Sequence, residues 1–442
     1  MFGSHMVQMV RANAHKLDRP LRESVLGLYK PFKWTPCFFH SLFEKTLMKN
    51  KKLSVIIEFE GNCYHQGCQF VNQVMQQKRR NKLKNHFPNI NCCSAEVTPA
   101  VLQSLLSQCQ DIRKVYLNRT VYTLLDVAVE ASHAKEVIRN QQKLTGKGVT
   151  VAVVDTGIYP HQDLEGRIRA FKDFVNQKTE PYDDNGHGTH CAGDVAGNGV
   201  SSAGKYRGPA PQADLIGVKV MNKIGAGTLE NVIQGVDWCI QFNEKNPDDP
   251  IDIISLSLGA EAIQYENEQE DPVVKAVETA WNAGIVVCAA AGNSGPDAKT
   301  IASPGVSNKI ITVGSLDDHD TLNRDDDTVA PYSSRGPTIY GKTKPDLLVP
   351  GTDVISLRSP GSFLDKLKKS SRVGTDYLQL SGTSMATPIC AGIAALILEQ
   401  VPNAKPDEVK SLLKNGTDLW KDRDPNIYGA GYINAENSVP KG

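Results

Sequence analysis

Short apolar segments alternate with amphipathic helical patterns from about residue 148 to residue 292, and this alternation constrains the fold more than any other feature of the chain. Apolar strands separated by helices are typical of a parallel sheet that helices cover on both faces. The sequence therefore predicts an α/β fold with a doubly wound, mostly parallel sheet. The expected strands are 149–155, 214–221, 251–258 and 285–292, and the expected helices are 231–242 and 273–284.

A different pattern occupies the first part of the chain, where strand-like and helical segments follow one another closely. Strands are expected at 53–60, near 92–98 and at 112–118, helices at 66–80 and 98–109, and a short extra helix around 41–47. Because 442 residues exceed the usual size of one domain, we expect more than one region. These are an N-terminal extension (1–45), a small α+β domain (46–123) and the α/β domain (124–442).

The formal net charge of zero hides an asymmetry between these regions. Residues 1–123 carry 18 Lys and Arg against 7 Asp and Glu, which leaves 31 against 42 for residues 124–442. The two parts should therefore attract each other. The basic run KRRNKLK (78–84) is either a nucleic-acid patch or a solvated helix face. We favour the helix face and expect no nucleic-acid partner.

No stretch of the sequence is apolar over the roughly 18–20 residues of a membrane span, and residues 1–20 lack the apolar core of a secretory signal. We therefore expect a cytoplasmic protein without a membrane partner. Release of the protein from the cell by a route that needs no signal peptide is left open. The ten cysteines are scattered, which fits a reducing compartment. Cys63, His65 and Cys68 are an alternative metal cluster, but a second pair is wrongly spaced, so free thiols are the better interpretation.

Four polar residues follow a strand or begin a helix, which are the places where an α/β sheet carries its sites. Asp155 ends the first strand, His187 lies in DDNGHGTHCAG, Asn293 follows the strand at 285–292, and Ser384 lies in SGTSMATP. Each is weak evidence alone, since Asp and Ser are ordinary turn and helix-cap residues. Together they suit acyl transfer, in which Ser gives its proton to a His that a buried carboxylate orients. Asn293 and the N-terminus of a helix at Ser384 would stabilise the oxyanion.

Six motifs carry a family resemblance: VVDTGI, NGHGTHCAG, SLSLG, AAAGN, YSSRGP and SGTSMATP. In this order they closely resemble the subtilisin family of serine proteases, from about residue 124 to residue 438. The resemblance implies that Asp155, His187 and Ser384 are the catalytic triad and that Asn293 is the oxyanion donor. It implies packing or turn roles for the neighbouring residues His190, Ser381 and Met385.

The same resemblance implies where substrate binds. Two edge segments would hold an extended peptide between them as an antiparallel strand, and small apolar residues without charge would wall the main specificity pocket. We therefore expect cleavage after Phe, Tyr, Leu or Met. The edge segments are Gly225, Ala226, Gly227 and Ser257, Leu258, Gly259, and the pocket residues are Ala290, Ala291, Gly292 and Ala302.

The first 123 residues resemble family propeptides in size, element order and position. This implies a self-processing zymogen whose N-terminal domain assists folding and then inhibits, with its tail (118–127) in the active site. Tyr122, Leu124 and Leu125 suit an apolar pocket, and cleavage is expected within about 121–127. The opposite charges of the two parts would speed their encounter.

Metal ions are not needed for this chemistry, so we expect no catalytic cofactor. The segment 197–211 stands where secreted relatives bind calcium, but it carries no acidic residue, and structural calcium elsewhere, for instance at 317–327, cannot be assigned. Cys191 follows His187 by four residues, hence by one helical turn. A mercurial bound to Cys191 should therefore displace the imidazole and inhibit.

Three functions are compatible with the sequence. The first is a serine endopeptidase acting through an acyl-enzyme. The second is a protease-derived binding or regulatory protein that its retained N-terminal domain keeps inactive. The third is an esterase or peptide ligase with the same triad, which differs from the first only in the acceptor.

Overall fold

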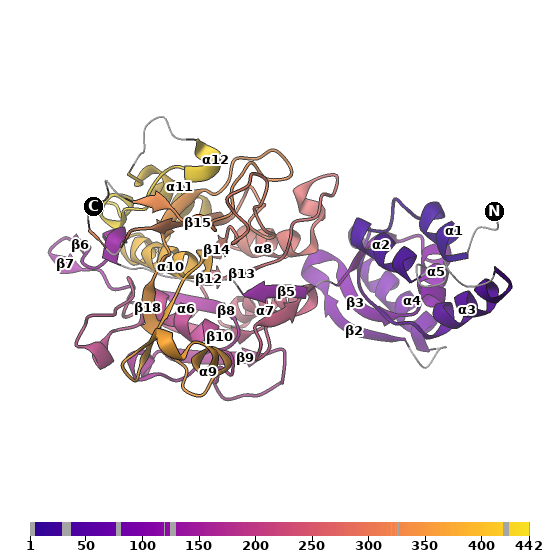
Figure 1. Ribbon diagram of the computed structural model, residues 1–442, viewed down its shortest axis with the longest axis horizontal. Helices are drawn as coiled ribbons and strands as arrows, with labels where there is room; N and C mark the ends of the chain where they lie inside the picture. Colours follow the sequence, from indigo (N-terminus) through magenta and orange to yellow (C-terminus); the bar gives the residue numbers. More distant parts are fainter. Residues whose placement is uncertain are drawn as a thin grey trace. The chain divides into compact units, whose positions relative to one another are not determined.

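The computed structural model describes residues 5–28, 37–76, 81–118, 120–123, 130–319, 321–322, 324, 327–418 and 424–441. The chain forms two compact units, Met1–Arg119 and Thr120–Gly442 (Figure 1). The short strand β5 (Thr120–Thr123), which the sequence analysis grouped with the N-terminal region, pairs with strands of the second unit.

The first unit is a small α+β structure, as expected. Its four strands form an antiparallel sheet in the order β2-β3-β1-β4. The succession β1-α4-β2-β3-α5-β4 is the ferredoxin-like double βαβ arrangement. The elements are α1 (His5–Ala12), α2 (Arg19–Gly27), α3 (Cys37–Asn50), β1 (Leu53–Phe59), α4 (Tyr64–Gln76), β2 (Lys82–Phe87), β3 (Cys92–Val97), α5 (Pro99–Gln108) and β4 (Ile112–Leu117).

The interpretation of the basic run as a helix face is wrong for its last residues. Lys82 begins β2, an edge strand in which exposed and half-buried residues alternate until the buried Phe87. The strand was missed because KLKNHF has a single large buried side chain and no β-branched residue. Charged side chains of this kind keep an edge strand from pairing with other molecules. Residues 78–80 lie outside the described residues.

The second unit contains the predicted mostly parallel sheet, in the order β16-β15-β14-β12-β8-β10-β9, with β17 also beside β15. All its pairs are parallel except β15 with β16. The fold class is therefore confirmed. The strands are β8 (Thr150–Asp155), β9 (Ile168–Asp173), β10 (Asp214–Lys219), β12 (Ile253–Leu256), β14 (Val286–Ala290), β15 (Ile311–Asp317), β16 (Thr328–Val329) and β17 (Leu347–Pro350).

Helices cover this sheet in two packed pairs, α6 with α10 and α7 with α8. Helix α10 contacts β12, β14 and β15, and α7 contacts β8 while α8 contacts β14. No helix among the described residues is both long and apolar enough to span a membrane. The helices are α6 (His187–Ala196), α7 (Leu229–Lys245), α8 (Pro272–Asn282), α9 (Phe363–Leu367), α10 (Thr383–Gln400), α11 (Pro406–Asn415), α12 (Pro425–Tyr428) and α13 (Ala435–Ser438).

Three smaller sheets complete the second unit. Strand β5 is the middle strand of β11-β5-β13, and β18-β20-β19 and β6-β7 form the other two. The strands are β6 (Ile138–Arg139), β7 (Gln142–Lys143), β11 (Ala226–Thr228), β13 (Leu258–Gly259), β18 (Val354–Leu357), β19 (Arg372–Val373) and β20 (Tyr377–Leu380).

The order of the main sheet places a topological switch point at β8. The neighbours of β8 are β10 on one side and β12 on the other, so the chain after β8 first builds one half of the sheet and then the other. Ligands of doubly wound folds bind outside the carboxyl ends of the strands at such a point. Asp155 is the last residue of β8.

Candidate active site

The carboxyl end of β8 and the first residue of α6 bring an acid and an imidazole together. His187 Nδ1 lies 2.7 Å from Asp155 Oδ1, and both side chains are 0% exposed. The same carboxylate oxygen accepts a 2.7 Å hydrogen bond from Thr156 N. A Cβ on Gly188 would overlap the Gly157 carbonyl, so only glycine lets α6 approach β8 this closely. The pair is therefore held in one orientation.

Asp183 connects the two elements that carry this pair. Its carboxylate accepts hydrogen bonds from Thr156 Oγ1 at 2.9 Å, Gly186 N at 2.8 Å and Asn185 N at 3.1 Å. It also accepts from Thr189 N at 2.9 Å and Thr189 Oγ1 at 2.7 Å. Asp183 was not singled out from the sequence, although it lies in the motif that contains His187.

The start of α10 carries Ser384, which is fully buried. Pro388 has no N–H, so the carbonyl of Ser384, four residues earlier, lacks its helical donor. Ser257 Oγ donates to that carbonyl at 2.7 Å. In return, the Ser384 hydroxyl donates to the carbonyl of Ser257 at 3.2 Å. The proline therefore helps to join the predicted nucleophile to a predicted substrate-binding residue.

Asn293 also contacts this helix start. Its side-chain oxygen accepts from Thr383 N and from Thr383 Oγ1, each at 3.0 Å. Since the oxygen is occupied by these donors, the amide nitrogen of Asn293 is the group left to donate. The structure thus brings Asn293 to the residue that precedes Ser384.

The charge state of the pair follows from its surroundings. Burial has the largest single effect on His187 and would lower its pKa, but the Asp155 carboxylate and the Cys191 side chain together raise it, so the pKa of His187 lies above its ordinary value of 6.5. Cys191 Sγ lies 3.7 Å from His187 Nδ1 and 3.9 Å from Asp155 Oδ2. Burial raises the pKa of the Cys191 thiol to about 12, so this neighbour is uncharged at neutral pH.

Two of the three neighbours that the sequence analysis kept apart from the triad, His190 and Ser381, have other polar partners. His190 Nδ1 lies 2.9 Å from Asp194 Oδ2, and its Nε2 lies 3.0 Å from the Leu378 carbonyl. The Ser381 hydroxyl donates to Asp353 at 3.3 Å. Among the described residues, neither His190 nor Ser381 forms a hydrogen bond with Asp155.

The two predicted edge segments flank an extended piece of the chain itself. Strand β5 pairs antiparallel with β11 and with β13. Tyr122 is opposite Ala226 on one side and Gly259 on the other, and Leu258 is opposite Thr123. These segments can therefore hold a strand between them. Cleavage was expected within about 121–127. Residues 121–123 belong to β5, and residues 124–127 lie outside the described residues.

The four residues of the predicted specificity pocket lie together at the end of β14 and in the segment that follows it. Ala302 N donates to the Ala291 carbonyl at 2.8 Å. Gly292 has a φ of 111°, and a Cβ there would lie 2.8 Å from Ser334 Oγ and 3.1 Å from Ala302 Cβ. Ala290 ends the strand and is fully buried. Ser334, which sequence reasoning did not select, could have been found in YSSRGP.

One group of side chains among the described residues could hold a metal ion. Asp155, His187 and Cys191 have ligand atoms within 4.8 Å of one another, and they are the one such group there. They include Asp155 and His187, the pair that the sequence predicts for acyl transfer. The acidic stretch 317–327 is described only in part, so structural calcium stays an untested prediction.

Comparison with known proteins identifies the family to which the chain belongs. The model of the subtilase family matches residues 146–431. The chain belongs to the subtilase family. It is 72% identical over 440 residues to serine protease AprX of Bacillus subtilis (strain 168), covering 100% of both chains. It is 35% identical over 294 residues to subtilisin Savinase of Lederbergia lenta, covering 66% of this chain and 91% of the relative.

A solved structure supports the fold of this subtilase. The crystal structure of fervidolysin from Fervidobacterium pennivorans, a keratinolytic enzyme related to subtilisin, matches with a TM-score of 0.68 and 21% identity. The match covers 88% of this chain and 61% of that chain. The family resemblance is confirmed, and the chain is a subtilisin-like serine protease, a hydrolase that acts on peptide or protein substrates.

Proposed function

We propose that this subtilase is a serine endopeptidase that cleaves peptide bonds through an acyl-enzyme and is made as a self-processing zymogen. The observation that carries the proposal is the buried Asp155–His187 pair, 2.7 Å apart, in a domain that holds its own strand β5 between the two edge segments. His187 is therefore positioned to act as a base, and β5 occupies the path that we propose for a substrate.

Each residue has a role in the proposed reaction. The Ser384 hydroxyl leaves the Ser257 carbonyl, gives its proton to His187 Nε2 and attacks the substrate carbonyl. Asp155 stays ionised and stabilises the imidazolium. The Asn293 amide and the N-terminus of α10 donate to the oxyanion. His187 then gives the proton to the leaving amine. In the second half of the reaction a water molecule gives a proton to His187 and attacks the acyl-enzyme, and His187 returns the proton to Ser384 as the carboxylic acid leaves. No step needs a cofactor.

Substrate recognition in this proposal rests mainly on the backbone. An extended peptide replaces β5 and pairs with β11 and β13, which gives affinity with little demand on side chains. The residue before the scissile bond enters the pocket of Ala290, Ala291, Gly292 and Ala302. Because these walls are small and uncharged, Phe, Tyr, Leu and Met are the preferred residues there.

The zymogen part of the proposal assigns the N-terminal region two successive roles. It assists the folding of the second unit and then inhibits it, until the enzyme cuts the chain within about 121–127. The nine cysteines whose side chains are described form no disulfide with one another, which fits our proposal that the enzyme works in the reducing cytoplasm.

One experiment separates the enzyme from a protease-derived regulatory protein. The wild type and Ser384→Ala are treated with a fluorophosphonate, weighed by mass spectrometry and compared on a gel. We expect one adduct on the wild type only, and retention of the N-terminal residues by the variant only. A natively folded wild type that takes up no reagent would contradict the proposed chemistry. Ser381→Ala is the matched control and should behave like the wild type.

A further inference from the structure

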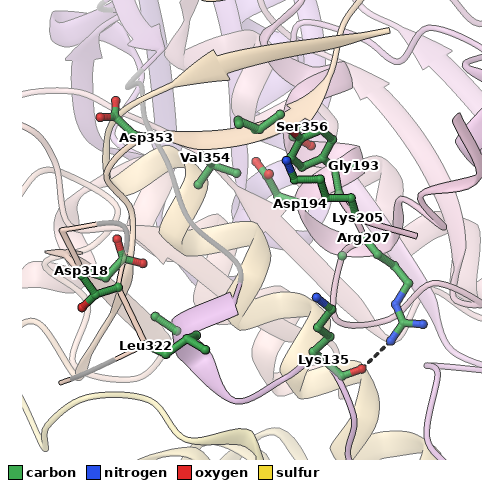
Figure 2. A pocket seen from close by; sticks show the side chains of 15 residues that line it. Lys135, Gly193, Asp194, Lys205, Arg207, Asp318, Leu322, Asp353, Val354 and Ser356 are labelled. Carbon is green, nitrogen blue, oxygen red and sulfur yellow. Dashed lines mark hydrogen bonds between the residues drawn. The ribbon is translucent and has the colours of Figure 1, made fainter. Parts of the chain in front are cut away.

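The second unit contains a cavity of about 450 Å³ that the proposed reaction does not use. Its size lies within the usual range for small-molecule sites. Figure 2 shows Asp318 and Asp353 on one side of it, Lys135 and Arg207 on the other, and Asp194 and Lys205 between. Apolar surface is supplied by Tyr206, Val354, Ile355 and Leu322. The cavity therefore offers both signs of charge beside an apolar wall.

Asp194 presents an acceptor that lacks a donor. The side chain is 0% exposed, and its Oδ1 has no hydrogen-bond partner among the described residues. Ser356 is a neighbour, but its hydroxyl has one proton and donates it to the His190 carbonyl at 2.9 Å. An unsatisfied buried oxygen is costly. A ligand that brings a donor would remove this cost.

The protonation of the His190–Asp194 pair does not change this conclusion. A carbonyl only accepts, so His190 Nε2 carries the proton of its hydrogen bond to Leu378 O. The 2.9 Å contact of Nδ1 with Asp194 Oδ2 then requires one further proton, shared between the two side chains. In either arrangement of that proton, Oδ1 remains an acceptor that points to a missing donor.

Arg207 presents a hydrogen-bond donor that lacks an acceptor. Its Nη2 donates to the Lys135 carbonyl, but its buried Nε has no partner among the described residues. The Lys205 ammonium lies 4.9 Å from the centre of the Tyr206 ring, beside the same cavity. A guanidinium donor without an acceptor and a nearby ammonium favour a carboxylate.

From these observations we infer that the cavity is a binding site for the zwitterion of a short peptide. The α-ammonium lies on the side of Asp194 and Asp353, the α-carboxylate on the side of Arg207 and Lys205, and an apolar side chain packs on Val354. Neither a simple anion nor a simple cation satisfies Asp194 and Arg207 together. The site is separate from β11 and β13, so it does not depend on the proposed catalytic roles.

Isothermal titration of full-length Ser384→Ala with the dipeptide Ala-Leu tests this inference. This variant keeps the probe from being hydrolysed. We expect saturable binding with a dissociation constant on the order of 1 mM or tighter. N-acetyl-Ala-Leu lacks the ammonium and Ala-Leu amide lacks the carboxylate, so each should bind roughly tenfold more weakly.

Two further variants locate the site. Lys205→Gln and Arg207→Gln, each combined with Ser384→Ala, should weaken Ala-Leu binding roughly tenfold. Lys245→Gln, at the exposed end of α7, is the matched control and should bind as before. Absence of binding, equal binding of the three probes, or binding that neither Lys205→Gln nor Arg207→Gln weakens would each overturn the inference. Circular dichroism of every variant reports whether it is folded.

Discussion

In the proposed reaction, two buried residues, Asp155 and His187, set the pH at which Ser384 can be activated. The charge of Asp155 favours the imidazolium, while His187 must be neutral to accept the proton of the serine. The Asp155–His187 contact therefore orients the base and also raises the pH at which His187 becomes neutral and able to accept the proton.

The first prediction concerns this pH dependence. Because the pKa of His187 is raised above 6.5, the fraction of neutral imidazole grows only as pH rises through that higher value. The plot of kcat/KM of the mature enzyme against pH should therefore have an acidic limb with its midpoint above 6.5. Asp155→Asn removes the charge, so it should move this midpoint down and also slow turnover. A wild-type midpoint below 6.5 would contradict the assignment.

The second prediction concerns Asn293. Asn293→Ala should lower kcat by roughly a hundred- to a thousandfold, the loss known for this donor in subtilisin. The substrate KM should stay nearly constant, because the oxyanion forms only in the transition state. Steady-state kinetics on a peptide substrate measure both constants. A raised KM with an unchanged kcat would instead assign Asn293 to ground-state binding.

Between elements, Asp183 joins the end of β8 to the start of α6. It accepts hydrogen bonds from Thr156 on the β8 side and from Gly186 and Thr189 at the helix. We therefore expect the Asp155–His187 distance to depend on Asp183, a residue without a chemical role in the proposed reaction.

The third prediction tests this role. Asp183→Ala should lower the free energy of unfolding by about 3 kcal/mol or more, and should lower kcat about a hundredfold where the protein is still folded. Asp173 is a matched control, because it is also buried and accepts hydrogen bonds from Val175 and Asn176. Asp173→Ala should lose stability but keep kcat. Equal kcat values for both variants would show that Asp183 is only structural.

Over the whole molecule, the charge difference between the two parts of the chain bears on the proposed inhibition. Residues 1–123 carry 18 basic against 7 acidic residues, and the remainder carries 31 against 42. Charges spread in this way speed association but are screened by salt.

The fourth prediction follows from this screening. Raising NaCl from about 0.1 M to about 1 M shortens the Debye length from about 10 Å to about 3 Å. After self-processing, the cleaved N-terminal fragment should rebind more slowly, so the lag before peptide hydrolysis should shorten. Progress curves at the two salt concentrations measure the lag. A lag that lengthens with salt would point to an inhibitor held mainly by apolar contacts.

The amino-acid sequence by itself determined the fold class and the residues that carry the family motifs. Strand and helix periods are local properties, so β8, β12, α7 and α8 could be placed within a few residues. The edge strand β2 escaped because its polar side chains lack the apolar pattern of a buried strand.

Tertiary structure alone decided which of these residues meet. The exchange of hydrogen bonds between Ser257 and Ser384 spans 127 residues of sequence, and the role of Asp183 depends on where β8 ends beside α6. The family resemblance led us to expect the tail 118–127 in the active site, but periodicity does not predict it, and only the structure shows β5 as the middle strand between β11 and β13. No local pattern predicts that Asp194 and Arg207 border one cavity. Such contacts form only when the order of the strands in the sheet brings distant segments together. The periodicity of the sequence indicates which residues are buried, but not which residues they contact.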